Sequence, residues 1–588
     1  MAKTGVIYGI NGPVVSLLGD SGFQMNEMVH VGQEKLVGEV IGLNSEKTTI
    51  QVYEETSGIK PGETVTGTGA PVSVTLAPGI LSNIFDGIER PLSEIAKGSG
   101  YYISRGISVN SLDTDKKWDT HMVVKEGDRI MPGTIIAEVP ETRAITHKVM
   151  APPDAEGYVL TVVPDGRYTI EEPLLTLQLM DGTERTLTMT QKWPIRVARP
   201  SARRFPAVKP LITGQRILDT MFPLAKGGTA AIPGGFGTGK TMTQHQVAKW
   251  SDADVIIYIG CGERGNEMTQ VLEEFSELVD PRSGNPLMDR TTLIANTSNM
   301  PVAAREASLY SGLTLAEYYR DMGYHVAIMA DSTSRWAEAL RELSGRLEEM
   351  PAEEGFPAYL ASRLSAFYER AGMIQNLNGT EGSVTIIGAV SPQGGDFSEP
   401  VTQNTKRFVR CFWGLDRNLA NERHFPAIHW LSSYSEYLTD LAPWYVDYVD
   451  KRFVDYRNRL VFILTQESSL MEIVKLIGGD MLPDDQKLIL EIAKVIRIGF
   501  LQQNAFHKED TCVPMEKQFL MMDLILYLYK KSRSLISMGM PMSVLREDPI
   551  FDKIISLKYD VPNDRLDLFD DYKKQVDAFY DSVIERNA

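Results

Sequence analysis

The amino-acid sequence predicts a multidomain α+β protein with a central domain of alternating strands and helices. Three features predict this class: short alternating apolar runs near the N-terminus, a glycine-rich phosphate-loop motif, and helical periodicity towards the C-terminus. The length of 588 residues suggests about four domains. We expect an N-terminal β-barrel, the central domain, a β-rich insertion within it and a C-terminal helical domain, over residues 1–72, 73–110 with 191–437, 111–190 and 438–588, respectively.

Two regions have the pattern of all-β structure. Near the N-terminus, turns separate short apolar alternations, and about six strands at this spacing predict a small barrel. Over residues 111–190, clusters of Gly, Pro and Asp mark the turns of a second β-rich region. Because this second region interrupts the approach to the phosphate-loop motif, we interpret it as an insertion.

From about residue 193 onward, apolar runs alternate with segments of helical pattern, which is typical of a parallel sheet covered by helices. The expected buried strands are residues 255–259, 292–295, 326–330 and 384–387. After Pro443 the pattern becomes helical. In one expected helix, the apolar side chains of Ile489, Ile492, Ile496 and Phe500 lie on one face. A further apolar-rich helix is expected over residues 519–529.

Charge and cysteine content argue against several classes of protein. The chain has 60 basic and 77 acidic residues and a net charge of −17, which disfavours a nucleic-acid binder because such binding depends on Lys and Arg at phosphates. Cys261, Cys411 and Cys512 are too few and too scattered for a disulfide framework or a cysteine-rich metal site. The sequence contains no apolar run of about 18 residues. These features predict a cytoplasmic protein that is not exported.

The central motif lies at residues 230–241, where Gly234, Gly239, Lys240 and Thr241 match the phosphate-loop pattern G-x-x-x-x-G-K-[ST]. Glycines allow successive backbone N–H groups to converge on phosphate oxygens at the start of the following helix. Lys240 would place its charge near the β- and γ-phosphates, and Thr241 would offer its hydroxyl to Mg²⁺. An apolar run over residues 229–232 before the loop and a possible helix over 240–250 after it argue against a chance glycine-rich turn.

Two acidic residues follow expected buried strands, and ligands of open parallel sheets bind beyond the carboxyl ends of the strands. If the strand before Glu263 neighbours the strand before the phosphate loop, Glu263 faces the γ-phosphate and could hold the attacking water. A salt bridge from Glu263 to Arg264 or to another cation is the alternative interpretation. Asp331 closes a second buried strand, at a position suited to orient Mg²⁺ through its water shell.

Longer motifs resemble the catalytic A subunits of V/A-type rotary ATPases. These motifs are GCGERGNE at 260–267, NTSNMPV at 296–302, DSTSRWA at 331–337, SPQGGD at 391–396, and PAIH at 426–429 followed by Ser433 and Ser435. The resemblance runs from the N-terminal barrel into the helical domain and is weakest beyond about residue 530. The insertion resembles the bulge domain that distinguishes A subunits from the β subunits of related synthases.

The resemblance implies a RecA-like nucleotide-binding domain that uses ATP or ADP with Mg²⁺ and hydrolyses or synthesises ATP. It implies a hexamer in which this chain alternates with B subunits around a central rotor shaft, with peripheral stalk subunits and a membrane sector that carries H⁺ or Na⁺. An arginine of the neighbouring B subunit completes the implied site, and nucleic acid is not an expected partner. The implied location is the inner face of the membrane, reached through the assembled complex.

The resemblance also implies residue roles. The expected catalytic residues are Glu263, which positions or activates the attacking water, Lys240, and Arg264, which senses the phosphate. Thr241 would bind Mg²⁺ directly, and Asp331 would bind a water molecule of the Mg²⁺ hydration shell. The expected nucleotide-binding residues are Gly234, Gly235, Phe236, Gly237, Thr238, Gly239, Lys240, Thr241, Met242, Phe425 and Phe506. The last two resemble an aromatic adenine pocket, although the residues alone would place them in the core.

Two positions depart from the family pattern, and two alternative functions stay open. Many relatives have Pro in place of Gly235, so a more flexible loop is expected here. Eukaryotic relatives have Cys in place of Thr238, so thiol-based inhibition is not expected at this position. The alternatives are a hexameric protein-export ATPase, against which the insertion and the length argue, and a non-catalytic nucleotide-binding ring subunit, against which Lys240, Thr241 and Glu263 argue.

Overall fold

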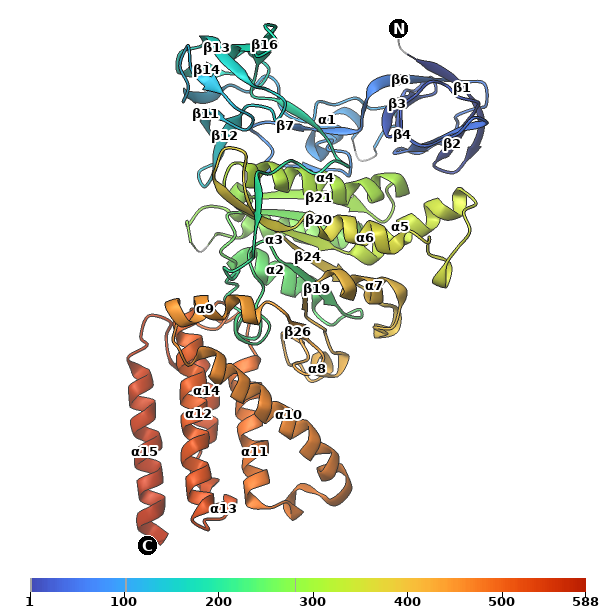
Figure 1. Cartoon of the computed structure of the whole chain (residues 1–588). Coiled ribbons are helices and arrows are strands. Elements are labelled where there is room, and N and C mark those ends of the chain that lie inside the picture. Colours follow the sequence, from blue (N-terminus) through green and yellow to red (C-terminus); the bar gives the residue numbers. More distant parts are fainter. Residues whose placement is uncertain (1–2, 101–102, 281, 588) are drawn as a thin grey trace. The chain divides into compact units, whose positions relative to one another are not determined.

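The computed structural model describes residues 3–100, 103–280 and 282–587 (Figure 1). The chain divides into two compact units, each assembled from several segments. Unit 1 consists of Met1–Pro206, Gly227–Thr229 and Ala253–Phe408. Unit 2 consists of Ala207–Lys226, Ala230–Asp252 and Val409–Ala588. The expected four domains therefore do not coincide with the two units, and their boundaries stay a prediction.

The N-terminal part of unit 1 is a closed antiparallel barrel, which confirms the predicted fold of this region. Its strand order is β1-β2-β5-β4-β3-β6. The strands are β1 (Thr4–Asn11), β2 (Val14–Leu18), β3 (Glu27–Val31), β4 (Leu36–Leu43), β5 (Lys47–Val52) and β6 (Thr64–Pro71). Alternate residues such as Val15, Val29, Ile50 and Val65 point inward and are fully buried, as period-two patterning predicts.

The predicted β-rich insertion is also present in unit 1. Its two four-stranded sheets have the orders β10-β13-β15-β16 and β12-β11-β9-β14. The strands are β9 (Trp118–Met122), β10 (Arg129–Ile130), β11 (Ile135–Pro140), β12 (Thr146–Met150), β13 (Gly157–Val162), β14 (Gly166–Tyr168), β15 (Leu175–Leu179) and β16 (Glu184–Leu187). Before and after it, β7 (Ser73–Leu76) and β17 (Gln191–Pro194) pair antiparallel, so the chain leaves and returns at one place, as expected of an insertion.

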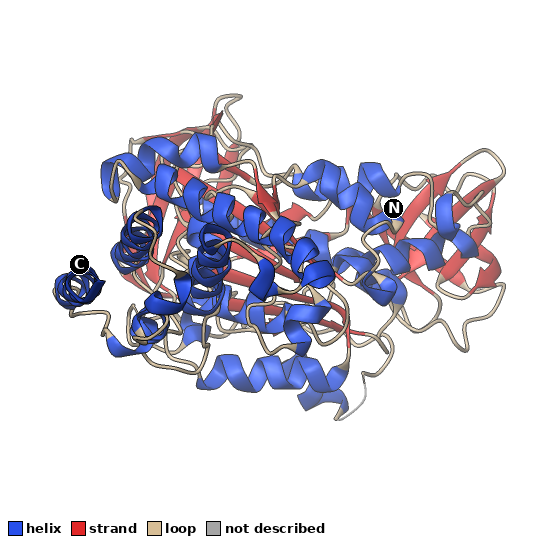
Figure 2. Cartoon of the chain, turned by 90° about the horizontal axis from the view of Figure 1, so that it is seen from below, coloured by secondary structure: helices blue, strands red, loops and turns tan. Residues whose placement is uncertain are grey.

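A parallel sheet with the order β24-β22-β20-β21-β8 forms the centre of unit 1. Its strands are β8 (Ile84–Phe85), β20 (Val255–Glu263), β21 (Thr291–Thr297), β22 (His325–Asp331) and β24 (Glu381–Val390), with β23 (Gly372–Gln375) antiparallel to β24 and to β18 (Arg203–Phe205). The four expected buried strands are therefore confirmed. Nearly every residue of these strands is buried, because helices cover the sheet (Figure 2).

The condition under which Glu263 would face the γ-phosphate, that its strand neighbours the strand before the phosphate loop, is not met. Both edges of β20, which ends at Glu263, are occupied by β21 and β22. The strand before the phosphate loop, β19 (Thr229–Pro233), is therefore not a neighbour of β20. The next two strands in sequence, β21 and β22, lie on either side of β20. The consecutive strands β19 and β20, which the phosphate loop and α2 connect, are therefore not adjacent in the sheet.

Helix α4 (Val302–Asp321) is buried along almost its whole length, from Ala303 to Asp321. Other helices of unit 1 are α1 (Leu92–Ser99), α3 (Gly265–Glu277), α5 (Thr333–Arg346), α6 (Leu360–Tyr368) and α7 (Pro400–Phe408). A helix buried on all sides needs partners beyond one sheet. The β-rich insertion supplies some of them.

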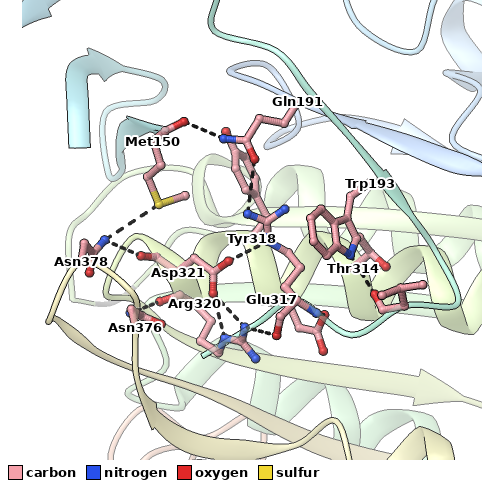
Figure 3. Close-up of polar contacts among 12 residues, drawn as sticks. Met150, Gln191, Trp193, Thr314, Glu317, Tyr318, Arg320, Asp321, Asn376 and Asn378 are labelled. Carbon is pink, nitrogen blue, oxygen red and sulfur yellow. Dashed lines mark hydrogen bonds and ion pairs between the residues drawn. The ribbon is translucent and has the colours of Figure 1, made fainter. Parts of the chain in front are cut away.

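Polar contacts connect the insertion and the strand that follows it to the end of α4 (Figure 3). Gln191 Nε2 donates to the carbonyl oxygen of Met150 on β12 at 2.6 Å. Arg199 Nε forms an ion pair with Asp321 Oδ2 at 2.6 Å. Asn378 Nδ2, between β23 and β24, donates to the carbonyl oxygen of Asp321 at 2.9 Å. The insertion itself contacts α4 through buried hydrogen bonds, between His147 Nε2 and Tyr318 Oη at 2.9 Å and from Tyr319 Oη to Glu141 at 2.9 Å.

Unit 2 combines a small sheet with the C-terminal helices, which confirms the predicted helical region. Strand β19 pairs parallel with β25 (Cys411–Phe412), which pairs antiparallel with β26 (Tyr434–Ser435). The helices are α2 (Lys240–Trp250), α8 (Arg417–Asn421), α9 (Leu438–Tyr448), α10 (Phe453–Ile477), α11 (Asp484–Lys494), α12 (Met515–Ser537), α13 (Met542–Leu545), α14 (Ile550–Asp560) and α15 (Leu568–Asn587). None of the described helices combines the length and apolarity that a bilayer span requires.

The expected apolar face near residue 490 is partly as predicted. Ile492, Ile496 and Phe500 are fully buried, whereas Ile489 is half-buried. The α-helix ends at Lys494, and Val495–Leu501 continues as a wider π-helix, so the spacing of 3.6 residues per turn does not hold over the whole segment.

Candidate nucleotide site

The phosphate-loop residues connect β19 to α2 within unit 2. Helix α2 begins at Lys240 and ends at Trp250, as the sequence predicts. Gly237 and Gly239 have φ angles of 79° and 87°, which other residues rarely adopt, so the turn into the helix requires glycine at both positions. A helix that begins in such a loop favours an anion at its N-terminus, through its first N–H groups and its dipole.

The side chains of the loop are arranged around its backbone. Lys240 Nζ reaches back to the carbonyl oxygen of Gly234 at 3.5 Å, so its charge lies over the loop. The buried Thr238 hydroxyl donates to the carbonyl oxygen of Gly235 at 2.8 Å and thereby braces the turn. Thr241 is half-buried in the first turn of α2, and Phe236 is 86% exposed at the tip of the loop.

The structure brings Phe425 and Phe506 together in one pocket of about 580 Å³, and the loop residues Gly237, Gly239 and Met242 line the same pocket. Phe506 is 88% exposed and Phe425 is 41% exposed, so both rings are accessible to a ligand. A large exposed aromatic side chain is unusual on a protein surface and suits stacking against a planar group. The pocket therefore offers an aromatic cleft directly beside a phosphate-binding loop.

Sequence reasoning missed other residues that line this pocket. They are Gln215, Leu218, Thr243, Gln246, Arg423, Pro426, Gln502, Gln503, Asn504, Ala505 and Tyr559. The polar run from Gln502 to Asn504, just before Phe506, was a signal that could have indicated three of them. Gln215 and Tyr559 lie in segments far from both phenylalanines in sequence, and the local pattern gives no indication of their position.

The two expected acidic residues lie at the ends of neighbouring strands of unit 1. Asp331 is the last residue of β22 and is 2% exposed, whereas Glu263 is the last residue of β20 and is half-buried. Tyr258 Oη donates to Asp331 Oδ2 at 3.2 Å. Burial, together with the charges of Asp331 and Glu263, raises the pKa of Tyr258 well above its ordinary value, so this hydroxyl stays a neutral donor to the carboxylate.

Arg264 follows Glu263 in sequence, and the charge of Glu263 acts on Arg335 and Cys261. Arg264 is exposed at the start of α3, and the charge of Glu263 helps to raise the pKa of Arg335, after the larger effect of the hydrogen bond from Arg335 to Glu338. Sequence reasoning gave Arg335 no role. Cys261 is fully buried, and burial raises the pKa of its thiol to about 12.

The residues expected to form the site fall into two sets, one within each unit. The phosphate loop, Phe425 and Phe506 belong to unit 2, and Glu263, Arg264 and Asp331 belong to unit 1.

Four protein-family models match successive parts of the chain. They describe the β-barrel domain of the ATP synthase alpha/beta family (residues 7–69), the barrel-sandwich domain of its subunits (109–196), its nucleotide-binding domain (214–435) and the C-terminal domain of V and A type ATP synthase (442–545). A V-type ATP synthase alpha chain of Halothermothrix orenii is 58% identical over 586 residues, which cover 100% of this chain and 99% of the relative. The chain belongs to the V/A-type ATP synthase A-subunit family.

A second relative has the corresponding role in Methanopyrus kandleri, as the A subunit of its A-type ATP synthase. It is 55% identical over 584 residues, which cover 99% of this chain and 98% of the relative. The chain is thus a catalytic A subunit of a V/A-type ATP synthase, an ATP-binding enzyme that hydrolyses or synthesises ATP in a machine coupled to ion transport. These comparisons confirm the family resemblance, the fold class and the main functional prediction.

A solved structure shares the fold at much lower identity. The assembled ATPase EscN of the enteropathogenic E. coli type III secretion system matches with a TM-score of 0.63 and 20% identity, and the match covers 89% of this chain and 99% of that one. At this identity the likeness shows the fold alone. The two alternative functions, an export ATPase and a non-catalytic ring subunit, are less well supported than the A-subunit function.

Proposed function

We propose that this A subunit binds MgATP at its phosphate loop, with the adenine base between Phe425 and Phe506, and hydrolyses or synthesises ATP where it meets a B subunit. The observation that carries the proposal is the shared pocket: two exposed aromatic rings, far apart in sequence, lie with loop residues Gly237 and Gly239 around one cavity. An aromatic slot beside a phosphate cradle matches the two ends of a nucleotide.

Each site residue has a proposed role. Lys240 and the loop N–H groups bind the β- and γ-phosphates, and Thr241 binds Mg²⁺ directly, because Mg²⁺ takes oxygen ligands. Asp331 supports the ion through water, and its burial beside a neutral Tyr258 donor suits a fixed acceptor of this kind. Glu263 orients or activates the attacking water, and Arg264 senses the phosphate.

The proposal extends to the assembly. The chain would alternate with B subunits in a hexamer around a central shaft, held by peripheral stalks, and couple ATP turnover to rotation and to H⁺ or Na⁺ transport by a membrane sector. An arginine of the B subunit would complete each site, and the A subunit would lie on the inner face of the membrane through the complex. Within the chain, we propose the four domains as 1–72, 73–110 with 191–437, 111–190 and 438–588.

The test is to mix the chain with its B partner, isolate the ring and measure phosphate release with MgATP. We expect a mixed hexamer whose hydrolysis falls about 10³-fold in Glu263→Gln, within the range for removal of a group that handles a proton. Nucleotide binding by this variant should be unchanged, because Gln keeps the size of the side chain. Equal loss of binding and hydrolysis would make Glu263 structural, and failure to form the ring would overturn the proposed assembly.

A further inference from the structure

One wall of the aromatic pocket is the segment Gln502–Phe506, which follows the π-helix Val495–Leu501. Three buried polar residues form what we call the base-wall cluster: Gln503 within this wall, and Arg216 and Asp510 behind it. Arg216 and Asp510 are completely inaccessible and Gln503 is 4% exposed. All three belong to unit 2, as does the pocket.

Arg216 binds the main chain of this wall directly. Its Nε donates to the carbonyl oxygen of Phe500 at 2.5 Å, and its Nη2 donates to the carbonyl oxygen of Gln502 at 2.8 Å. Its Nη1 forms an ion pair with Asp510, whose other carboxylate oxygen accepts the backbone N–H of Asn504 at 2.7 Å. The rigid guanidinium group therefore holds the chain at Phe500 and Gln502 directly and at Asn504 through Asp510, all within the stretch that leads to Phe506.

Gln503 connects this wall to the opposite one. Its backbone N–H donates to the carbonyl oxygen of Phe425 at 2.8 Å, and its Nε2 donates to the carbonyl oxygens of Gly214 and Asp510 at 2.8 and 2.7 Å. Its Oε1 accepts the backbone N–H of Arg216 at 2.8 Å. The separation of the two aromatic rings is therefore determined by a continuous set of buried hydrogen bonds.

Lys558 is a second cation that binds the carbonyl oxygen of Gln502. Lys558 Nζ on α14 donates to the carbonyl oxygen of Ile498 at 2.6 Å and to that of Gln502 at 3.2 Å. Burial, and then the nearby charge of Arg216, lower the pKa of Lys558 to about 8. Two buried cations that share a main-chain carbonyl are expensive to bury. Core packing alone does not require them, because apolar residues often replace a buried ion pair without loss of stability.

We propose that Arg216 is a positioning residue for the nucleotide base: it fixes the wall that carries Phe506 and, through Gln503, sets that wall against Phe425. Arg216 lies beneath the pocket and does not form its lining. The inference rests on the proposed function of the pocket as the base site. It predicts that Arg216 affects the affinity for the base and leaves the affinity for the phosphates unchanged.

The test compares two ligands on the full chain, ATP and inorganic tripolyphosphate, which lacks the base. Arg216→Lys keeps a positive charge beside Asp510, but a single ammonium group cannot also donate to the carbonyl oxygens of both Phe500 and Gln502. We expect ATP to bind about tenfold more weakly, in the range of one lost base-stacking contact, and tripolyphosphate to bind as in the unaltered chain. Arg457→Lys is the matched control, since Arg457 also donates to a main-chain carbonyl, that of Met221, and lies outside the base-wall cluster. It should leave both affinities unchanged.

Two results would overturn the positioning role: weaker binding of ATP and tripolyphosphate by the same factor, or no change in either. If Arg216→Lys does not fold, as judged by circular dichroism, Asp510→Asn carries the test with the same expectations: Asp510 joins Arg216 to the wall but does not line the pocket, and Asn keeps its shape. Phe506→Ala separates this inference from the proposed base site. If Phe506→Ala leaves ATP affinity unchanged, the base site itself is wrong and the positioning role is overturned with it; if Phe506→Ala weakens ATP selectively and Arg216→Lys does not, only the positioning role is wrong.

Discussion

The two compact units carry different parts of the proposed reaction. Unit 2 holds the phosphate loop and the aromatic pocket, which are groups that bind. Unit 1 holds Glu263 and Asp331 at the ends of buried strands, which are groups suited to place water and a metal ion. If the proposed roles hold, nucleotide affinity and turnover depend on separate sets of residues, so variants and conditions should be able to change one without the other.

The units also bury their charges in different surroundings. In unit 1, Glu141 lies 2.8 Å from His147 Nδ1 and accepts from Tyr319 Oη at 2.9 Å, and His147 Nε2 lies 2.9 Å from Tyr318 Oη. In unit 2, Asp219 accepts from neutral donors, such as the hydroxyl of Thr213 at 2.7 Å and the side-chain amide of Gln518 at 3.0 Å. For Glu141 the partners outweigh burial, whereas for Asp219 burial outweighs the neutral donors, so the two carboxylates should respond to pH in opposite directions.

Removing the B subunit should separate binding from turnover most strongly. We expect the isolated chain to bind ATP but to hydrolyse it roughly 10³- to 10⁵-fold more slowly than the mixed ring, because the arginine that stabilises the transition-state charge is proposed to lie on the neighbour. Binding by fluorescence titration and phosphate release under the same conditions measure the two properties. Rapid magnesium-dependent turnover by the monomer would show that this chain holds a complete site.

The sequence predicted most of the fold because its patterns are local. Alternation identified the barrel, and continuous apolar runs identified β20, β21, β22 and β24. The order of the strands is a different matter. The sequence does not show whether β19 neighbours β20, because connections between parallel strands are not encoded in either strand, and in the structure β21 and β22 lie beside β20. Local pattern predicts an element more reliably than its neighbours.

In the candidate site too, features set by local sequence were predictable and features set by tertiary packing were not. The loop and α2 were predicted to the residue, since glycine positions and the following helix are sequence features. The accessibility of Phe425 and Phe506 could be expected only from the family resemblance, because whether an aromatic residue is exposed depends on tertiary packing. Arg216 carried no signal in the sequence, since its importance comes from carbonyl groups far along the chain, at Phe500 and Gln502.

The second prediction concerns the two buried carboxylates and pH. Burial alone would raise the pKa of Glu141, but His147 and the N–H groups of Leu81 and Gly79 outweigh it and lower the pKa. The stability that this carboxylate contributes is therefore present above the pKa of the unfolded state and is lost as pH falls through the folded value. Burial raises the pKa of Asp219 to about 6, so its contribution falls as pH rises from about 4 to 6, by about 3 kcal/mol.

Glu141→Gln and Asp219→Asn test these opposite signs. The cost of Glu141→Gln should grow as pH rises from acid to neutral, whereas the cost of Asp219→Asn should shrink over the same range. Hydrogen exchange of α4 amides for the first variant and α12 amides for the second, corrected for intrinsic rates, measures each unit separately. Costs that change with pH in the same direction would show that the surroundings of the two carboxylates are not the cause.

The smallest expected effect is that of thiol reagents on the assembled ring, because no described cysteine lies exposed in the phosphate loop. Cys261 and Cys411 are buried, and burial raises the pKa of Cys261 and of the half-buried Cys512 to about 12, so little thiolate is present at neutral pH. We expect N-ethylmaleimide to leave ATP hydrolysis within about twofold of the untreated ring. Met242→Cys is the control: Met242 is 38% exposed and lines the pocket, so a thiol there should be alkylated, and ATP should protect it. Loss of activity in the unaltered ring that ATP prevents would place a reactive cysteine at the nucleotide after all.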